Sequence, residues 1–331
     1  MSLSISIGIS PRESLHDWAT FTTRLEEHGV AEMWLIDSQL AMKDAYIGLA
    51  LAATNTENMR LGTGVSNLVT RHPTVTANGI AAVAELSDGR AVLGIGAGDS
   101  SVFGLGSRPS KVAEVEESLG FFGSVLAGGK GVWQGREYEL PASPPPTPLY
   151  LAVSRPRMCR LAGRLADGAI VMGPAQPDVL SEQLGWIEEG IEEAGRRRED
   201  VRICFITTLS ARDDEKAALA DVQSWATGQA RLLADAAELP ESLRPFRDDI
   251  MRARDEYDYS EHLSTRAGHQ GAISDELVRV LAVAGNAAEC VERVRELKAT
   301  GIDELIFPLM GGGRLERLQT LTDEIAPALR A

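Results

Sequence analysis

The feature that most limits how this chain can fold is a repeated alternation between short apolar runs and longer stretches with helical periodicity. Short apolar runs suit strands that are buried on both faces of a parallel sheet, and the helical stretches supply the crossovers that such strands require. We count eight apolar runs along the 331 residues. They lie at residues 4–9, 32–36, 59–63, 91–95, 149–153, 168–172, 201–209 and 304–308.

Helical patterns separate most of these runs. The first extends over residues 14–28, and Gly29 ends it as a C-terminal cap. The others lie at residues 45–53, 73–87, 112–126, 156–165, 177–194, 287–299 and 315–329. Eight strands that alternate with helices predict a (β/α)8 barrel that forms a single domain over residues 1–331.

Two stretches interrupt the alternation and are predicted to be insertions on the barrel. Residues 128–148 follow strand four and contain a short aromatic strand-like piece and a proline cluster that cannot continue a helix. Residues 213–274 follow strand seven and are charged and helix-rich. Because loops after strands build the active-site face of a barrel, the second insertion is either a lid or substrate wall, or else a solvated hairpin or an oligomer contact.

Charge and hydropathy exclude two kinds of partner. The net charge of −15, from 33 basic and 48 acidic residues, repels the phosphates of nucleic acids. No apolar stretch reaches the roughly 20 residues of a membrane span, and the N-terminus lacks a signal-peptide pattern. We therefore expect a soluble, cytoplasmic protein whose ligands are small molecules.

Cysteine and histidine spacing gives no sign of a metal site. Cys159, Cys204 and Cys290 are far apart and have no second ligand at metal spacing, so we expect buried thiols. The five histidines show no such spacing either. His72 lies just before a predicted helix, where it either donates to a nearby pocket or has a structural role, and the position favours the structural role.

Polar residues and glycines gather where the predicted strands end, which is where barrels place their sites. Asp37 follows strand two, and Ser66 follows strand three. Gly62 and Gly64 would let a flat ring approach the backbone of strand three.

Strand four ends in a glycine cluster at Gly94, Gly96 and Gly98, followed by Asp99. The spacing does not match the dinucleotide-binding pattern GxGxxG, so we reject a phosphate loop there. Tight strand packing and a ligand role explain Gly94 equally well. Gly96 and Asp99 lie nearer the open face.

Two longer runs carry a specific resemblance. They are residues 61–77 (LGTGVSNLVTRHPTVTA) and residues 85–99 (ELSDGRAVLGIGAGD). Together with residues 150–153, 156–168, 194–196 and 301–305 they cover most of the chain outside the second insertion. The pattern resembles the methylenetetrahydromethanopterin reductase branch of the luciferase-like superfamily.

The resemblance implies a (β/α)8 barrel that binds coenzyme F-420, an 8-hydroxy-5-deazaflavin, or in sister branches FMN. A hydride would pass between C5 of the ring and an organic substrate. It also implies a non-prolyl cis peptide bond between Gly64 and Val65, against which the ring would rest. The other strand-end residues expected around the ring are Asp37, Ser38, Ser66, Asn67 and Gly96.

The phosphate of either cofactor needs backbone N–H groups, which helix N-termini provide. Ser154 and Arg155 precede a helix that starts with a proline, and Gly173 and Pro174 precede the next helix. These two helix starts are the predicted phosphate cradle. Arg157 either belongs to the cradle or is an ordinary exposed residue of the first turn.

The chain departs from the reductase pattern at Ser10, where the family carries an acidic residue, and at Ser38, where it usually carries histidine. Both changes remove groups that would donate a proton to a pterin nitrogen. We therefore expect a different small carbonyl, imine or activated alkene as substrate, with Asp37 or Asp99 as the proton carrier.

Two other functions remain open: an FMN-dependent monooxygenase that uses dioxygen, and a barrel that binds a flavin without turnover. Relatives of this kind commonly pair through the first barrel helices, so we expect a homodimer. The substrate cavity should be mostly apolar and lie above strands one to four. Its expected apolar walls are Ile9, Leu40, Val65 and Leu68.

Overall fold

The computed structural model of this chain describes residues 5–9, 14–39, 42–236, 238–259, 268–309 and 313–330. Ser10 and Leu40, on which two expectations depend, lie outside the described residues. The chain divides into two compact units. The N-terminal unit comprises Ser4–Val171 and Gln183–Cys204, and the C-terminal unit comprises Met1–Leu3, Met172–Glu182 and Phe205–Ala331.

The main sheet contains nine strands, and all eight predicted apolar runs contribute to it. They are β1 (Ile5–Ile9), β2 (Val30–Leu35), β3 (Arg60–Thr63), β4 (Ser66–Asn67), β5 (Ala91–Gly96), β8 (Leu149–Val153), β9 (Gly168–Met172), β10 (Arg202–Ile206) and β13 (Glu304–Pro308). Their order is β3-β2-β1-β13-β10-β9-β8-β5-β4, and β3 also pairs with β5, which closes the sheet. Because β3 and β4 both pair with β5, they share one place in the ring. The predicted (β/α)8 barrel is confirmed.

The predicted helices are present with ends shifted by at most a few residues. They are α1 (Leu15–Glu27), α2 (Ala45–Asn55), α3 (Pro73–Leu86), α5 (Val112–Leu126), α6 (Pro156–Leu165), α7 (Pro177–Glu193) and α11 (Ala287–Ala299). The closing segment forms α12 (Arg314–Thr320), a π-helical turn at Leu321–Ile325, and α13 (Ala326–Arg330). Ser14 caps α1 by accepting from the backbone of Asp17, and Gly29 ends it with a φ of 79°. None of the helices in the described ranges is both long and apolar enough to cross a membrane.

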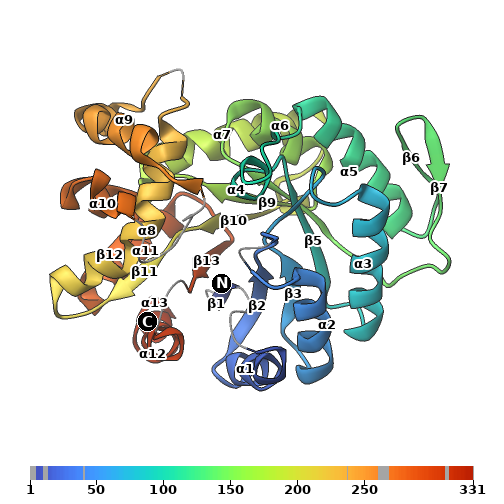
Figure 1. The fold of residues 1–331 in the computed structure, drawn as a ribbon, viewed down its shortest axis with the longest axis horizontal. Coiled ribbons are helices and arrows are strands. Elements are labelled where there is room, and N and C mark those ends of the chain that lie inside the picture. The colour runs from blue at the N-terminus through green and yellow to red at the C-terminus, as the bar shows by residue number, and fades with distance from the viewer. Residues whose placement is uncertain are drawn as a thin grey trace. The chain divides into compact units, whose positions relative to one another are not determined.

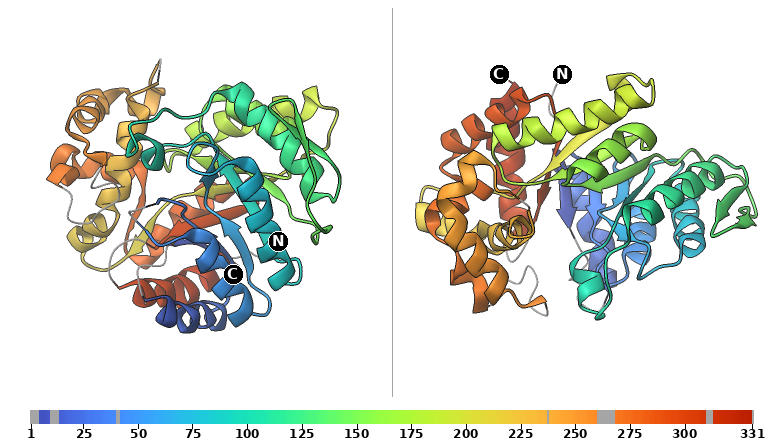
Figure 2. Two further views of the ribbon diagram at one scale, coloured as in Figure 1. Left: turned by 45° about the vertical axis from the view of Figure 1, so that its right-hand side comes forward. Right: turned by 90° about the horizontal axis from the view of Figure 1, so that it is seen from above.

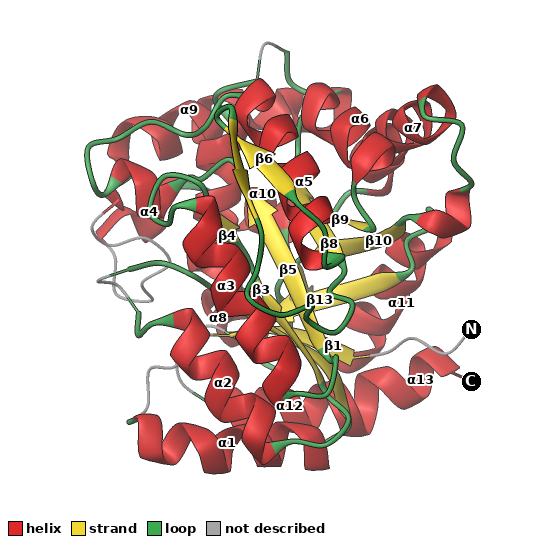
Figure 3. Ribbon diagram, turned by 90° about the vertical axis from the view of Figure 1, so that its right-hand side faces the viewer, coloured by secondary structure: helices red, strands yellow, loops and turns green. Residues whose placement is uncertain are grey.

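In the N-terminal unit, α2 and α3 lie side by side along the outer side of the strands (Figures 1 and 3). Between the strands, large side chains face glycines. An added Cβ on Gly62 would lie 2.5 Å from the indole of Trp34, and one on Gly168 would lie 2.5 Å from the ring of Tyr150. The Trp34 and Tyr150 rings are 5.4 Å apart. Because Gly62 and Gly168 have no side chains, the rings of Trp34 and Tyr150 can fill the space between these strands.

The turn between α2 and β3 is held by two charged side chains. The carboxylate of Glu26 accepts from the backbone N–H groups of Glu57, Asn58 and Met59. Arg90 donates to the carbonyl oxygens of Ala53, Thr56 and Met59. Backbone groups that neither helix nor strand would satisfy are paired in this way.

The first insertion forms the predicted strand-like piece as a hairpin of β6 (Gly131–Trp133) and β7 (Arg136–Tyr138). Gln134 and Gly135, with φ of 50° and 73°, make the turn. The hairpin stands beyond α5 in both views of Figure 2. It rests on Phe121 of α5, whose ring lies 6.5 Å from Trp133 and 6.0 Å from Tyr138.

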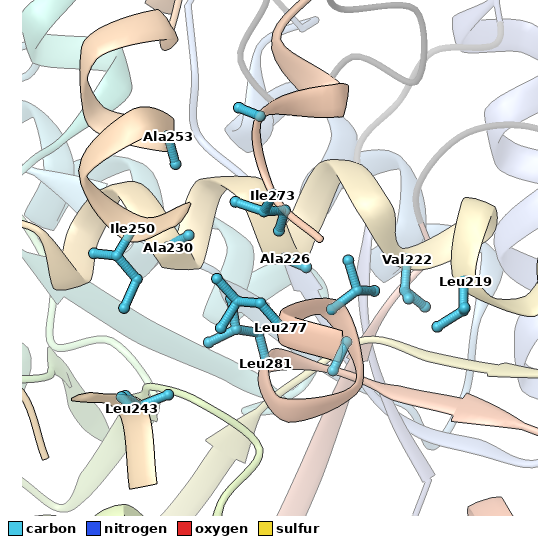
Figure 4. Close-up of a cluster of buried hydrophobic side chains, with 13 residues drawn as sticks. Leu219, Val222, Ala226, Ala230, Leu243, Ile250, Ala253, Ile273, Leu277 and Leu281 are labelled. Carbon is cyan, nitrogen blue, oxygen red and sulfur yellow. The ribbon is translucent and has the colours of Figure 1, made fainter. Parts of the chain in front are cut away.

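The second insertion is helical, as predicted, and has its own apolar cluster. It includes α8 (Glu215–Leu233) and α9 (Arg247–Glu256), and α10 (Asp275–Leu281) follows it. The predicted seventh strand is divided: β10 is followed by a separate β11 (Leu209–Ala211), which pairs with β12 (Val283–Gly285). Figure 4 shows side chains of the three helices turned toward one another. Among them are Leu219, Val222, Ala226, Ala230, Ile250, Ala253, Leu277 and Leu281.

Replacing Gly94 with alanine should destabilise the protein by about 1–3 kcal/mol, because the new methyl group would overlap the carbonyl oxygen of Thr63. Gly120→Ala is the matched control, since Gly120 is an exposed residue of α5 and nothing lies within 4 Å of its added Cβ. That control should stabilise the protein by about 0.5–1 kcal/mol. Urea unfolding of both variants measures the difference, and equal stability would contradict the packing argument.

Glu26 should make stability depend on acid pH. Burial raises the pKa of Glu26, but the three backbone N–H donors and the charge of Arg90 outweigh it, so the pKa lies below its ordinary value. The stabilisation is therefore complete above the ordinary glutamate pKa and is lost as pH falls through the lowered one. Glu26→Gln should lower the unfolding free energy at pH 7 and narrow its gap to wild type near pH 3. A gap that stays constant with pH would rule out the ionic contribution.

Candidate functional site

Strand ends in the N-terminal unit bring several predicted site residues around one carboxylate. Asp37 follows β2, Ser66 lies on β4, and Arg71 stands just before α3. Asp37 Oδ2 accepts from Ser66 Oγ at 2.7 Å and from Arg71 Nε at 3.1 Å. Asp37 is only 6% exposed, so its charge is balanced by a cation within the fold. Among the described residues no group donates to its second oxygen, Oδ1.

Arg71 is shared between two carboxylates. Its Nη2 donates to Asp44 Oδ2 at 2.5 Å, and its guanidinium lies 4.6 Å from the centre of the Tyr46 ring. Asp44 also caps α2 by accepting from two backbone N–H groups of its first turn. Partial burial raises the pKa of Asp44, but the contact with Arg71 and these two N–H groups bring it below its ordinary value. The guanidinium is thereby fixed in place between Asp37 and Asp44.

Tyr46 completes this network. Its hydroxyl lies 3.1 Å from Ser66 Oγ. Because a carboxylate only accepts, Ser66 must give its proton to Asp37, and Tyr46 therefore donates to Ser66. Burial raises the pKa of Tyr46 above its ordinary value, so the phenol stays protonated. Gly79 of α3 leaves room for this ring, since an added Cβ would lie 2.8 Å from Tyr46 Cδ1.

Asn67 holds a neighbouring segment. Its Nδ2 donates to Ser101 Oγ at 3.2 Å, and Gln39 Nε2 donates to the carbonyl oxygen of Ser101 at 2.6 Å. Ser101 lies on the short helix α4 (Ser100–Phe103), whose N-cap is Asp99. Asn67 Oδ1 is also occupied, by two backbone N–H groups of the following loop. Both ends of the Asn67 amide are thus bonded within the protein, and the amide positions α4.

The predicted glycines have distinct explanations. The Gly64–Val65 peptide bond is cis, as the resemblance implies. An added Cβ on Gly64 would lie 2.8 Å from Trp34 Cβ, and one on Gly96 would lie 3.0 Å from Val65 Cγ2. Gly94 is explained by strand packing, because its Cβ would overlap Thr63. Val65 and Ser38 are half-buried.

The residues predicted to bind the phosphate belong to different units, and each group is described within its own unit. In the N-terminal unit, Arg155 is the N-cap of α6 and Pro156 occupies its first position, and no side chain caps the helix. The first-turn N–H groups of α6 are therefore not claimed by a capping side chain. Ser154 is exposed, and its carbonyl oxygen accepts from Gln183 Nε2. Gly173 and Pro174 are buried residues of the C-terminal unit.

Other sequence expectations are resolved as follows. His72 is the N-cap of α3, where its Nδ1 accepts from the backbone of Thr74, so its structural role is confirmed. All three cysteines are buried thiols, as expected. Burial raises the pKa of the Cys159 thiol to about 12. Ile9, an expected cavity wall, is fully buried.

Sequence reasoning missed three members of the Asp37 network. Arg71 lies within the run of residues 61–77, but no acidic neighbour in sequence marks it as a partner of Asp37. Asp44 precedes the predicted helix at the position of an N-cap, and that signal gave no indication of its second bond to Arg71. Tyr46 follows in the first turn of the same helix.

Comparison with known proteins finds one matching family model and relatives that span nearly the whole chain. Residues 3–304 match the family model for luciferase-like monooxygenases. The 5,10-methylenetetrahydromethanopterin reductase of Methanolobus tindarius is 25% identical over 92% of this chain and 93% of its own length. The F420-dependent glucose-6-phosphate dehydrogenase of Nakamurella multipartita is 26% identical over 95% and 92%.

A solved structure shows the same fold. The coenzyme F420 dependent tetrahydromethanopterin reductase from Methanopyrus kandleri superimposes with a TM-score of 0.80, covering 99% of this chain and 100% of that chain at 21% identity. The family model covers most of the chain, from residue 3 to residue 304. This protein therefore belongs to the luciferase-like monooxygenase family of enzymes.

Proposed function

We propose that this protein is an oxidoreductase that transfers a hydride between coenzyme F-420 and a small organic substrate. The observation that carries the proposal is the nearly full-length similarity to enzymes of two activities. The reductase from Methanopyrus kandleri and the dehydrogenase from Nakamurella multipartita are both named for dependence on F420. Their names differ in the substrate, so the similarity supports the cofactor more strongly than any one substrate.

The residues of the N-terminal unit suit a planar ring that carries an anionic chain. Gly64 and Val65 offer a surface without polar side chains at the end of β3, and Asp37 and Ser38 lie at the end of β2. The uncapped start of α6 provides N–H groups for a phosphate, and Arg155 adds a positive charge there. We assign the same role to Gly173 and Pro174 at the start of the next helical connection.

When bound, the deazaflavin supplies a ring carbon that gives or accepts a hydride. The protein orients the donor and acceptor and excludes water. Asp37 Oδ1 is the acceptor available for a substrate proton, since Oδ2 is held by Ser66 and Arg71. Asp99, at the start of α4, is the second proposed proton carrier, and Asn67 and Gln39 position it by holding Ser101.

An FMN-dependent monooxygenase is the second candidate function. The family model is described by that chemistry, and FMN also carries a phosphate that the α6 start would bind. A pterin substrate receives less support than a carbonyl, imine or activated alkene, because Ser38 stands where a proton-donating histidine is expected. Ser10 lies outside the described residues.

We also propose a homodimer. Helices α2 and α3 carry large apolar side chains on their exposed side: Ile47 is 52% exposed, Val75 55% and Leu86 48%. Exposed apolar side chains that form a continuous patch commonly mark a protein interface. Light scattering of the purified protein measures the mass directly.

Titration of the purified protein with oxidised F-420 and with FMN, followed by quenching of its five tryptophans, should show tighter binding of F-420. Arg155→Ala should weaken the binding of both cofactors, because each carries a phosphate. Arg24→Ala, an exposed change on α1, should leave both affinities unchanged. If FMN bound tightly and F-420 did not bind, the result would contradict the proposal and support the monooxygenase function.

Asp37→Asn should lower kcat/KM by about 10²-fold or more, because the amide cannot take a proton from substrate. Asp44→Asn is the matched control: it also removes a carboxylate from Arg71 but keeps the helix cap. F-420 absorbance with methylenetetrahydromethanopterin, glucose 6-phosphate and a carbonyl panel would be followed, with thermal unfolding in parallel. Equal activity losses in the two variants would assign Asp37 to the scaffold.

A further inference from the structure

A hollow of about 320 Å³ lies in the N-terminal unit, and its lining begins one residue after Asn67 in the sequence. Leu68 and Val69, which directly follow β4, line it. Arg108 and Lys111, from the segment that precedes α5, also line it, as does Trp133 of the hairpin. Its volume lies at the lower end of the range for small-molecule sites, about 300–1,000 Å³.

The hollow is basic in an acidic protein. Arg108 and Lys111 are exposed, and neither side chain forms an ion pair with any residue that the structure describes. Glu114 also lines the hollow, but its carboxylate accepts from the backbone N–H of Lys111 at 2.7 Å and so caps α5. Two cations therefore remain free to meet an anion.

The rest of the lining is mixed: Leu68, Val69, Pro109 and Trp133 are apolar, and Ser110 and Gln134 are polar. Trp133 is 5% exposed and packs against Phe121 of α5. Val69 is 37% exposed, and Leu68 is half-buried. A ligand that suits this lining carries negative groups spaced along a chain of methylenes, with the methylenes against the apolar residues.

The hollow and the α6 start lie at the same edge of the sheet. The backbone N–H of Ser110 donates to the carbonyl oxygen of Ala97, which places the start of α5 at the carboxyl end of β5. The start of α6 directly follows the carboxyl end of β8. β5 and β8 are parallel neighbours, so both helix starts face the same side.

We propose that this hollow binds the oligoglutamate tail that extends beyond the phosphate of the deazaflavin, with Arg108 and Lys111 pairing with its carboxylates. The inference rests on the proposed function. A γ-linked glutamate chain has the required chemistry, because each unit brings one carboxylate and two methylenes. FMN ends at its phosphate and does not use the hollow, so these residues select between the two cofactors.

The test compares three ligands: F-420 with several glutamates, the same cofactor without glutamates, and FMN. Dissociation constants are measured by tryptophan quenching at low and high salt. Arg108→Ala with Lys111→Ala should weaken binding of the long-tailed cofactor by about fivefold at low salt. The loss should shrink as salt rises, because exposed ion pairs are screened. The tail-less cofactor and FMN should bind the variant as they bind the wild type.

The matched control is Arg24→Ala with Lys216→Ala, two exposed cations outside the hollow with the same change in net charge. A similar weakening in this control would reduce the effect to general electrostatics and overturn the proposal. Equal affinity of wild type for long-tailed and tail-less cofactor would also overturn it, and would leave the proposed function intact. Failure of both deazaflavins to bind the wild type would instead refute the proposed function, and this inference with it.

Discussion

The arrangement of the N-terminal unit depends on the packing of Trp34 inside the barrel. Its indole leaves no space for a side chain at Gly62, and its Cβ leaves none at Gly64. The end of β3 can therefore approach β2 closely, and the backbone N–H of Gly64 donates to the carbonyl oxygen of Leu35 at 2.6 Å. This approach brings β4 and its Ser66 within reach of Asp37. The polar groups around Asp37 thus depend on the apolar packing of Trp34 against Gly62 and Gly64.

Around Asp37, the pairing of charged side chains determines which polar groups remain available to a ligand. A buried carboxylate without a partner would be costly, and Arg71 supplies the partner for Asp37. Asp44 and the ring of Tyr46 fix the guanidinium in turn. Ser66 and Asn67, which the sequence suggests as direct ligands, direct their described hydrogen bonds to other protein groups. Asp37 Oδ1 is therefore the one acceptor of this network to which no described protein group donates.

The fold was largely predictable because apolar runs and helical periods are local properties of the chain. The strands at 149–153, 168–172 and 304–308 and the start of α6 have the predicted ends. The break between β10 and β11 was missed because the predicted apolar run at residues 201–209 continues from β10 to Leu209, the first residue of β11. The Asp37–Arg71–Asp44 network was also missed, since these side chains meet only after the α2 crossover brings the ends of β2 and β4 together. A single sequence shows which residues are polar, and it does not show which of them neutralise one another.

The apolar cluster of α8, α9 and α10 has a different consequence. All of its buried members lie between Leu219 and Ala282, so this segment is stabilised by contacts within itself. Helix faces turned away from such a core can exchange residues freely, because new side chains there disturb no packed neighbour. The outer faces of these helices are thus a suitable place for sequence to diverge during evolution, or for an engineer to graft a different recognition surface, without loss of the packed cluster.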